Sequence, residues 1–330
     1  MGGADPAEAL LQIAAGACLP RCLHTVAELG VPDVLGDEPR ATESLAKQVG
    51  ANPDALYRIL RLLAANGVFE LRGTEVNHTA VSRLLSSAHP QSMRAIALMF
   101  GLPVNWSPFL ELRYAVETGQ PASTKALPEG YWNYFAQNSN AAEVFNAAMV
   151  AKAHGQVAAA VAAYDFAPFR MIADIGGGRG HLISAVLAAN QSARGVLFDL
   201  PHVIRDAGTL KSERLSLQAG SFFTDPLPSC DLYCLMEVIH DWGDTQALEI
   251  LAAVRRCAPK GATLLLIEAL VPDDSLPHFA KTLDIVMLAL LGGKQRTQAE
   301  YWDLARKAGF SPQREIPTSA GVSLLEAKAS

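Results

Sequence analysis

The sequence predicts an α/β protein in which a mostly parallel sheet, covered by helices on both faces, follows a mainly helical domain. Two observations carry this prediction. After position 171, β-prone and helix-prone segments alternate along the chain, which is typical of parallel sheets with helical crossovers. Before position 100, two amphipathic segments and a short hairpin follow an alanine- and leucine-rich stretch. With 330 residues, the chain is long enough for two domains with separate cores.

The N-terminal domain is expected to begin with a helical stretch at Ala7–Leu29, kinked at Pro20. Apolar residues cover more than one face of this stretch, which favours burial on both sides and a contact with a second subunit. Two amphipathic helices are expected at Thr42–Val49 and Pro53–Asn66, and Asn52 is a suitable N-cap for the second.

Two β-prone segments, Val68–Leu71 and Glu75–His78, then form a hairpin pattern, so that the domain has the order of a winged helix. Winged helices often bind DNA. Here, however, leucine and isoleucine dominate Pro53–Asn66, which stands in the place of a recognition helix, and the net charge is −6. Both features oppose a polyanionic partner. We therefore expect a packing and dimerisation module, with a ligand-sensing DNA-binding regulator as the alternative.

The remaining elements follow from apolar periodicity and from turn residues. Helices are expected at Ser92–Phe100, Pro108–Thr118, Gly130–Asn138 and Ala141–Tyr164. Strands are expected at Met171–Ile175, Ala193–Asp199, Leu215–Ala219, Leu232–Met236, Thr263–Glu268, Arg314–Thr318 and Val322–Ala327. The helices of the sheet domain are expected at His181–Ala189, His202–Ala207, Thr245–Cys257, Phe279–Leu291 and Glu300–Ala308.

The most informative stretch is I-A-D-I-G-G-G-R-G, in which a β-prone segment runs into an acid and a glycine-rich turn before a helix. Gly176, Gly178 and Gly180 permit positive φ and let a ligand approach the backbone. Strand, loop and helix in this order are typical of nucleotide sites. The dinucleotide pattern would require glycine where the next residue is histidine. Asp174 before G-x-G-x-G favours S-adenosylmethionine, while a dinucleotide site or a structural turn remain alternatives for the loop alone.

The ends of the other predicted strands also carry polar or aromatic residues. Asp199 lies about twenty residues beyond the loop, where a carboxylate can accept ribose hydroxyls. Gly220–Phe223 offers an aromatic wall for adenine, and Glu237–Trp242 and Glu268 follow the next two strands. Because ligands of open parallel sheets bind outside the carboxyl ends of the strands, we expect these residues to meet at one edge.

Together, the motifs D-x-G-G-G-x-G, F-D-L-P, G-S-F-F, I-H-D-W-G-D and G-G-K-Q-R-T closely resemble those of the class I O-methyltransferases. These act on small molecules in plant phenolic and bacterial natural-product metabolism, and include the acetylserotonin and caffeate types. The resemblance covers nearly the whole chain. It implies a Rossmann-like methyltransferase domain, an N-terminal domain that forms a homodimer with exchanged helices, and S-adenosylmethionine as donor without a metal.

The resemblance also implies domain limits and residue roles. The limits are residues 1–100 for the dimerisation domain, 101–164 for a helical connector to the acceptor pocket, and 165–330 for the catalytic domain. His240 would be the general base, with Glu268 and Gln295 beside it. The donor site would comprise Asp174, Gly176, Gly178, Gly180, Asp199, Leu200, Ser221, Phe222 and Met236, and the acceptor would contact Asn146, Met149 and Trp242.

Three positions depart from the family pattern. Gln295 stands where many members have a glutamate beside the histidine, Ser221 where aspartate is commoner, and Met236 where plant members often have lysine. Because glutamine carries no charge, we expect His240 to be a weaker base or the acceptor to be acidic already.

Each candidate also has a structural alternative. Asp174 and His240 can cap backbone amides, Asp199 can start a turn, and Glu268 can be a solvated acid. Asn146, Met149 and Trp242 can belong to the core. A further alternative keeps the fold and the donor but assigns non-methylating chemistry, such as hydroxylation, decarboxylation or cyclisation.

Composition excludes several other classes. Hydrophobic residues make up 50% and charged residues 18%, which is typical of globular proteins. We find no apolar run of about eighteen residues, as a membrane helix requires, and no secretory signal pattern, so we expect no membrane partner and a cytoplasmic location. The odd number of cysteines, five, opposes a disulfide framework. Two pairs are spaced C-x-x-x-C, Cys18/Cys22 and Cys230/Cys234, and we expect these four to be small buried hydrophobes rather than zinc ligands.

Overall fold

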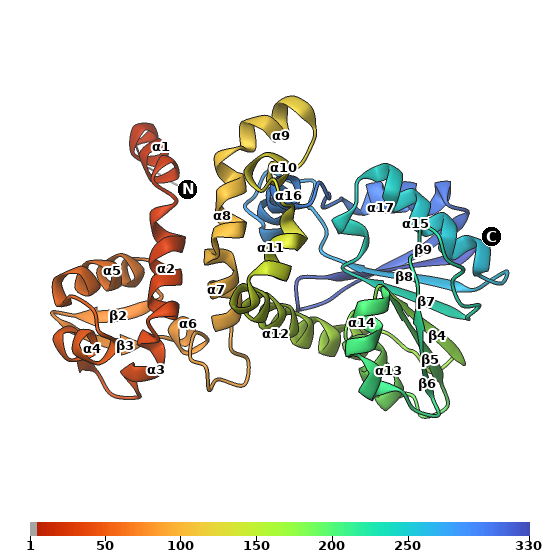
Figure 1. The fold of residues 1–330 in the computed structure, drawn as a ribbon, viewed down its shortest axis with the longest axis horizontal. Helices are drawn as coiled ribbons and strands as arrows, with labels where there is room; N and C mark the ends of the chain where they lie inside the picture. The colour runs from red at the N-terminus through yellow and green to blue at the C-terminus, as the bar shows by residue number, and fades with distance from the viewer. Residues whose placement is uncertain (1–4) are drawn as a thin grey trace. The chain divides into compact units, whose positions relative to one another are not determined.

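The computed structural model describes residues 5–330. The chain divides into two compact units, one comprising Met1–Trp106 and Trp132–Lys152, the other Ser107–Tyr131 and Ala153–Ser330. The residues between the N-terminal domain and the sheet therefore contribute to both units. Helix α12 (Ser139–Ala163) itself crosses the division (Figure 1).

The N-terminal helical stretch consists of two helices, α1 (Pro6–Ala14) and α2 (Cys18–Glu28), which meet at a bend of 41°. The expected kink at Pro20 is wrong, because the break precedes this residue. Pro20 lies in the first turn of α2, where backbone N–H groups have no helical partner, so the helix accommodates it. Helix α1 buries none of its own side chains.

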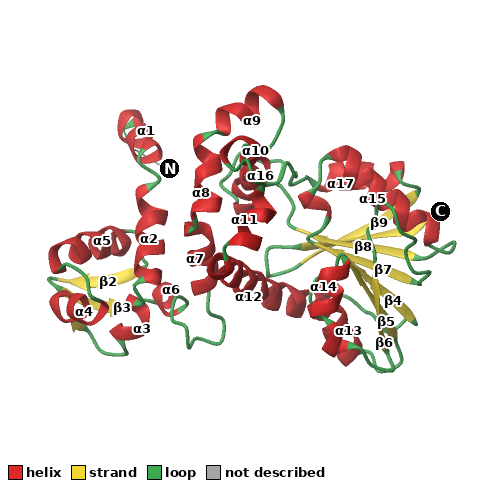
Figure 2. Cartoon of the chain, viewed as in Figure 1, coloured by secondary structure: helices red, strands yellow, loops and turns green. Residues whose placement is uncertain are grey.

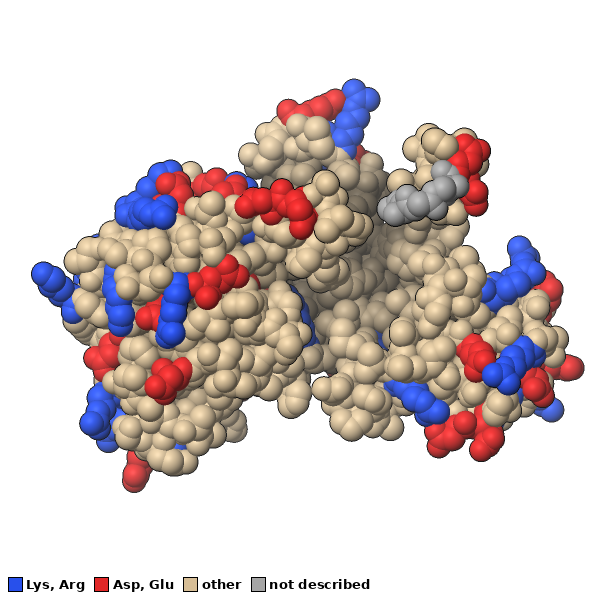
Figure 3. All heavy atoms as spheres, turned by 180° about the vertical axis from the view of Figure 1, so that it is seen from behind, with Lys and Arg blue, Asp and Glu red and all other residues tan. Residues whose placement is uncertain are grey.

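The winged helix has the expected elements, α4 (Thr42–Val49), α5 (Pro53–Ala65), β2 (Phe69–Arg72) and β3 (Glu75–His78). Strand β1 (Arg40–Ala41) completes a three-stranded antiparallel sheet of order β1-β3-β2. Leucines from α4 and α5 fill its core, which explains why the second helix is so apolar. Acidic and basic side chains are interspersed on the face drawn in Figure 3, without a continuous basic patch. Two short helices accompany these elements, α3 (Val31–Leu35) and α6 (Ala80–Arg83).

The middle of the chain is helical, as expected, but one predicted helix is divided. Instead of a single helix at Pro108–Thr118, the structure has one that ends at Leu110 and another that begins at Leu112. Pro103, rather than Pro108, occupies the first turn, where proline is favoured. The helices of this region are α7 (Arg94–Gly101), α8 (Pro103–Leu110), α9 (Leu112–Thr118), α10 (Ser123–Ala126), α11 (Tyr131–Gln137) and α12.

The second unit contains a seven-stranded sheet of order β6-β5-β4-β7-β8-β10-β9, with helices on both faces (Figure 2). Strands β4 to β8 run parallel, and β10 is antiparallel to both neighbours. The strands are β4 (Met171–Ile175), β5 (Arg194–Asp199), β6 (Leu215–Ala219), β7 (Leu232–Met236), β8 (Thr263–Glu268), β9 (Phe310–Pro317) and β10 (Ser323–Ala329). The helices are α13 (His181–Ala189), α14 (Pro201–Asp206), α15 (Asp244–Cys257), α16 (Phe279–Leu290) and α17 (Gln298–Lys307).

The order in which the chain adds strands to the sheet reverses between β4 and β7. From β4 the chain proceeds to β5 and β6 on one side, and then to β7 and β8 on the other. In an open parallel sheet, the crevice at the carboxyl ends of two such strands is where ligands bind. Apolar cores cover the two faces of the sheet.

All five cysteines are free thiols. Cys230 and Cys234 are buried as expected, but Cys18 is exposed and Cys22 is only partly buried, so the expectation of burial is wrong for the first pair. Within residues 5–330, no single helix is long and apolar enough to cross a membrane, although α1 and α2 together meet that test of length and composition.

Candidate functional site

The glycine loop after β4 has a shape that side chains would prevent. Gly176, Gly178 and Gly180 all have positive φ, between 58° and 71°. A Cβ on Gly177 would lie 2.4 Å from Cγ of Asp174, and one on Gly176 would lie 2.9 Å from Val238. These distances are too short for non-bonded carbons, so the backbone approaches its neighbours in a way that only glycine allows.

Asp174 lies in β4, one residue before the strand ends and the loop begins, and it is almost completely buried. Its Oδ2 accepts a hydrogen bond of 3.2 Å from the backbone N–H of Ile183 in the first turn of α13, as the capping alternative requires. Its Oδ1 is buried and has no hydrogen-bond partner within the described part of the chain. Burial raises the pKa of Asp174 to about 7. One carboxylate oxygen therefore remains available for a cationic or hydrogen-bonding ligand.

Asp199, at the end of β5, ties that strand to the glycine loop. Its Oδ2 accepts a hydrogen bond of 2.8 Å from the N–H of Gly178, and its Oδ1 accepts one of 2.7 Å from the N–H of Leu200. Since a carboxylate has about four acceptor positions, Asp199 retains capacity for further donors such as hydroxyl groups.

Aromatic rings after β6 and β7 pack together. The ring centroids of Phe222 and Phe223 lie 4.8 Å apart, and that of Trp242 lies 5.8 Å and 4.9 Å from them, all in edge-to-face arrangements. Trp242 therefore packs against two aromatic side chains, as we expect if its role is structural. Ser221 begins the same turn, where its N–H donates to Oδ2 of Asp225 at 2.8 Å.

His240 lies in a single 3-10 turn (Ile239–Asp241) after β7, and polar side chains enclose its imidazole. Its Nδ1 lies 3.2 Å from Oε2 of Glu268 at the end of β8 and 2.9 Å from Nε2 of Gln295. Its Nε2 lies 3.2 Å from Oδ1 of Asp241. His240, Glu268 and Gln295 are each no more than 5% exposed. The structure therefore brings these three sequence candidates together.

The neighbouring carboxylates determine where the imidazole carries hydrogen. An ionised carboxylate only accepts, so Nδ1 carries a hydrogen toward Glu268, and in the protonated ring Nε2 carries one toward Asp241. Rotating the side-chain amide of Gln295 by a half-turn exchanges its oxygen and nitrogen. Its Oε1, which has no hydrogen-bond partner among residues 5–330, then faces the Nδ1–H of His240. Oε1 of Glu268 accepts a hydrogen bond of 2.9 Å from the N–H of Ile239, so the carboxylate also holds the turn.

The charges around His240 make it more basic than free imidazole. Burial alone would lower its pKa, but the carboxylates of Glu268 and Asp241 outweigh burial and raise the pKa to about 10. The uncharged residue at position 295 therefore leaves His240 a strong base, because Asp241 supplies a second carboxylate. Asp241 belongs to the I-H-D-W-G-D motif, but the sequence analysis gave it no role.

Arg296 is a second site residue that the sequence analysis missed, although it lies in the G-G-K-Q-R-T motif. Its side chain is fully buried and donates hydrogen bonds to the backbone on both sides of His240. An arginine is exposed in most proteins, and its burial depends on residues far away in the sequence. The motif was the only indication that this position is unusual.

The remaining four candidates differ in burial. Met236, at the end of β7, is half-buried, and Leu200 is 45% exposed. Asn146 and Met149 belong to α12 in the first unit, where Asn146 is exposed and Met149 is half-buried. Exposure excludes Asn146 from the core of that unit.

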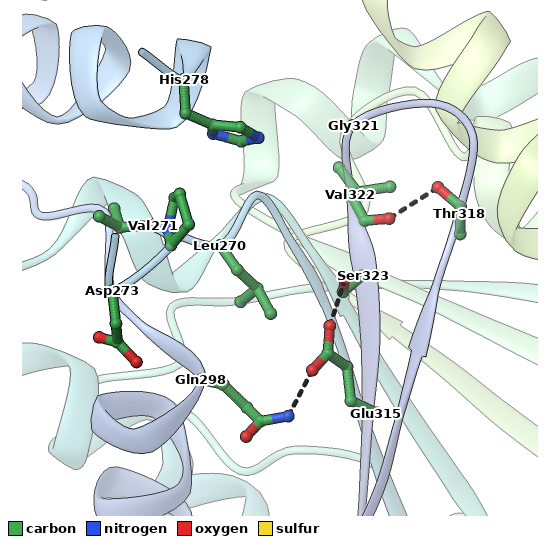
Figure 4. Close-up of a pocket in the computed structure, with 11 residues that line it drawn as sticks. Leu270, Val271, Asp273, His278, Gln298, Glu315, Thr318, Gly321, Val322 and Ser323 are labelled. Carbon is green, nitrogen blue, oxygen red and sulfur yellow. Dashed lines mark hydrogen bonds between the residues drawn. The ribbon is translucent and has the colours of Figure 1, made fainter. Parts of the chain in front are cut away.

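A cavity of about 430 Å³ lies beside the turn between β9 and β10 (Figure 4). Leu270, His278 and Gly321 line it, and Glu315 accepts a hydrogen bond from Gln298 at its wall. None of the sequence candidates lines this cavity, so it is separate from the His240 cluster. Among residues 5–330, no group of three His, Cys, Asp or Glu side chains could hold a metal ion.

Comparisons with known proteins agree with this arrangement. A family model for an O-methyltransferase domain matches residues 109–311, and one for an O-methyltransferase dimerisation domain matches residues 11–88. The chain is 38% identical over 325 residues to a phenazine O-methyltransferase of Lysobacter antibioticus, covering 97% of this chain and 95% of that protein. It is 33% identical over 321 residues to the mitomycin biosynthesis 6-O-methyltransferase of Streptomyces lavendulae, with 95% and 92% covered.

A solved methyltransferase of calicheamicin biosynthesis, in its S-adenosylhomocysteine-bound form, superposes with a TM-score of 0.91. It is 30% identical in sequence, and the match covers 99% of this chain and 100% of that one. The chain therefore belongs to the O-methyltransferase family, and it is an S-adenosylmethionine-dependent enzyme with the dimerisation domain of that family.

Proposed function

We propose that this enzyme methylates a hydroxyl group of an aromatic or polyketide-like small molecule, with His240 as the general base. The observation that carries the proposal is the buried imidazole between two carboxylates at the crevice of the sheet. The phenazine enzyme among its relatives, by its name, acts on an aromatic compound, which supports an aromatic acceptor.

The donor site consists of residues that fit a cationic nucleoside. When bound, S-adenosylmethionine supplies a methyl group on a positively charged sulfur. Oδ1 of Asp174, buried and without a partner in the described chain, suits a group of positive charge. The free acceptor positions of Asp199 suit ribose hydroxyls, and the ring of Phe222 suits a face of adenine. The other members of the donor site are Gly176, Gly178, Gly180, Leu200, Ser221 and Met236.

His240 provides the proton chemistry. In its neutral form, Nε2 accepts the proton of the acceptor hydroxyl. A bound donor would supply the methyl group to that oxygen and, as its C–S bond breaks, would leave as S-adenosylhomocysteine. The imidazolium that results is stabilised by Glu268 and Asp241, the groups that raise the pKa of His240 to about 10. A phenol also has a pKa of about 10, so the proton transfer is close to balanced. Glu268 and Gln295 fix the ring and its tautomer from the Nδ1 side.

The residues that we propose for contact with the acceptor are Trp242, Asn146 and Met149. In the same proposal, residues 101–164 connect the dimerisation domain 1–100 to the catalytic domain 165–330.

The test is an assay of labelled methyl donor against a panel of phenols, enols and carboxylic acids, with His240→Ala as the matched variant. General base catalysis contributes about 10²- to 10⁴-fold, so we expect a loss of that size in rate. Donor affinity, measured by calorimetry, is expected to stay unchanged. Full activity of the variant, or loss of donor binding, would contradict the role of His240.

The same assay addresses non-methylating chemistry, such as hydroxylation, decarboxylation or cyclisation. Mass spectrometry of the product is expected to show a gain of one methyl group. A product without that gain would favour the alternative, in which the donor serves only as a bound charge.

We also propose a cytoplasmic homodimer with exchanged N-terminal helices. Leu10, Leu11 and Ile13 on α1 are 68%, 70% and 76% exposed, and a single chain leaves this apolar surface uncovered. Sedimentation equilibrium at micromolar concentration is expected to give a dimer. Leu11→Asp is expected to shift the mass toward the monomer, and Val81→Asp, which is exposed on another helix, serves as the control. A monomeric wild-type enzyme would contradict the proposal.

A further inference from the structure

We propose that Arg296 is the positioning residue for His240: its guanidinium fixes the turn that presents the imidazole, without contacting donor or acceptor. The inference rests on the proposed role of His240 as the base. It concerns a residue for which neither the motifs nor the contacts of the imidazole itself assign a role.

The turn that carries His240 needs external support. It contains a single 3-10 turn and no longer helix or strand. It follows Glu237, whose φ of 53° is the only positive φ of a non-glycine residue within the described chain. Such a conformation is strained in residues with a side chain, and it persists only where surrounding contacts determine it. The position of the imidazole therefore depends on what holds this turn.

Arg296 holds the turn at both ends. Its Nη1 donates to the carbonyl of Ile239 at 3.2 Å, and its Nη2 donates to the carbonyl of Trp242 at 2.8 Å. These carbonyls lie on either side of His240. The same guanidinium donates from Nε and Nη2 to Oδ1 of Asp244, at 2.9 Å and 2.8 Å. One side chain therefore joins the turn to the first residue of α15.

The backbone next to Arg296 fits the same turn. The N–H of Lys294 donates to the carbonyl of His240 at 2.8 Å. A Cβ on Gly293 would lie 2.1 Å from that carbonyl oxygen, so the two segments touch backbone to backbone. Arg296 also donates to the carbonyl of Lys294 at 3.1 Å, which ties its own loop into the arrangement.

Only arginine has the donors for this role. The guanidinium is planar and carries five N–H groups in a fixed fork, and here they serve three carbonyls and a carboxylate. Lysine keeps the charge but offers one ammonium group, which cannot reach carbonyls on opposite sides of the turn at once. Arg296→Lys therefore keeps the positive charge but removes the fork of donors, and it tests the geometry of the side chain separately from its charge.

The first experiment measures kcat, the acceptor KM and donor affinity for Arg296→Lys, with the full-length enzyme and an acceptor from the panel. We expect kcat to fall about 10- to 100-fold, as for a displaced catalytic group, while donor affinity by calorimetry stays within twofold. Arg255→Lys is the matched control, because Arg255 also donates to backbone carbonyls, those of Gly309 and Ala258, at the far side of the unit. Equal kcat in both variants would overturn the inference.

A second variant covers the case in which Arg296→Lys does not fold. Asp244→Asn removes the charge that orients the guanidinium, at a side chain that is 61% exposed and leaves no cavity. It is expected to lower kcat about 3- to 10-fold with unchanged donor affinity. An unchanged kcat in this variant would count against the inference.

The decisive measurement is a double-mutant cycle with His240→Ala. If Arg296 acts through His240, Arg296→Lys lowers the rate of wild type but leaves the residual rate of His240→Ala unchanged. A further 10-fold loss in the His240→Ala background would overturn the inference, because Arg296 would then act on its own. If Arg296→Lys has normal activity and His240→Ala is inactive, only the role of Arg296 is overturned. If His240→Ala is fully active, the proposed role of His240 as the base is overturned as well.

Discussion

The glycine loop and the His240 turn follow neighbouring strands, β4 and β7, yet different interactions determine their shapes. The loop takes its form from its own residues, because glycines supply positive φ and Asp174 folds back on the next helix. The turn takes its form from residues far along the chain, namely Glu268 and Arg296. The donor end of the site is thus locally encoded, while the base end is assembled by tertiary contacts.

The largest effect is expected at the base end. Glu268→Gln keeps the acceptor for the N–H of Ile239 but removes a buried charge beside His240. A hydrogen bond to a charged group contributes about 1.5–3 kcal/mol, so we expect the maximum kcat at high pH, where His240 is neutral in both enzymes, to fall about 10- to 150-fold. Glu249→Gln, on the exposed face of α15, is the control. A rate equal to that of the control would show that Glu268 is not coupled to the base.

The pH profile of the same variant sharpens the comparison. Neutral His240 is the active form, so at saturating donor the rate of wild type rises with pH up to a pKa of about 10. Glu268 raises this pKa, and its neutral replacement therefore moves the rise to lower pH. Rates measured between pH 6 and pH 10 test this, and a profile that does not move would contradict the electrostatic explanation. This pH range spans the reference pKa of imidazole, about 6.5, and the raised pKa of His240.

At the donor end, Gly177→Ala tests whether the loop is determined locally. The new Cβ would lie 2.4 Å from Cγ of Asp174, and overpacking of this kind costs about 1–3 kcal/mol. We expect donor affinity to fall about 5- to 150-fold, measured by calorimetry. Gly208→Ala, where a Cβ would meet nothing within 4 Å, is the control. Unchanged affinity would mean that the loop adapts.

Asp174 links donor binding to pH. Burial raises its pKa to about 7, above its value in the unfolded chain, so the ionised form is disfavoured in the free enzyme. Below pH 7 the neutral carboxyl gives no charge to a cationic donor, and above pH 7 the carboxylate does. Donor affinity is therefore expected to rise about tenfold from pH 6 to pH 8. Asp174→Asn should abolish this rise, and a rise that persists in the variant would assign it to another group.

The linked effect on stability has the opposite sign. A carboxyl with a raised pKa in the folded state destabilises the free enzyme as pH increases from its unfolded value toward about 7. Asp174→Asn is expected to remove this loss, and thermal unfolding without donor measures it. Asp206→Asn, at an exposed position of α14, is the control.

The smallest effect is expected from Gln295→Glu, which adds a third carboxylate beside His240. It raises the pKa of His240 further, so less of the neutral base is present at pH 7, and the rate there should fall about 3- to 10-fold. The maximum rate at high pH should be retained. Gln191→Glu, an exposed position, is the control. A faster rate at pH 7 would contradict this account of the base.

The same contrast explains what could be predicted from the sequence. Strands β4, β7 and β8 and the glycine loop lie where the residue pattern placed them, because apolar runs and glycines report local structure. His240 and Glu268 were found through motif resemblance. The contacts of Arg296 reach residues 54 and 57 positions away, and nothing periodic in a single sequence encodes such pairs. Pro20 was misjudged because the helix start depends on the break before it.

The guanidinium of Arg296 has one further consequence. Burial would raise the pKa of Asp244, but its hydrogen bonds to Arg296 outweigh burial and lower the pKa. Asp244, which orients the guanidinium, therefore stays ionised over the range in which the imidazole titrates. The architecture around the base can therefore stay constant while the protonation of the imidazole, and with it the rate, changes with pH.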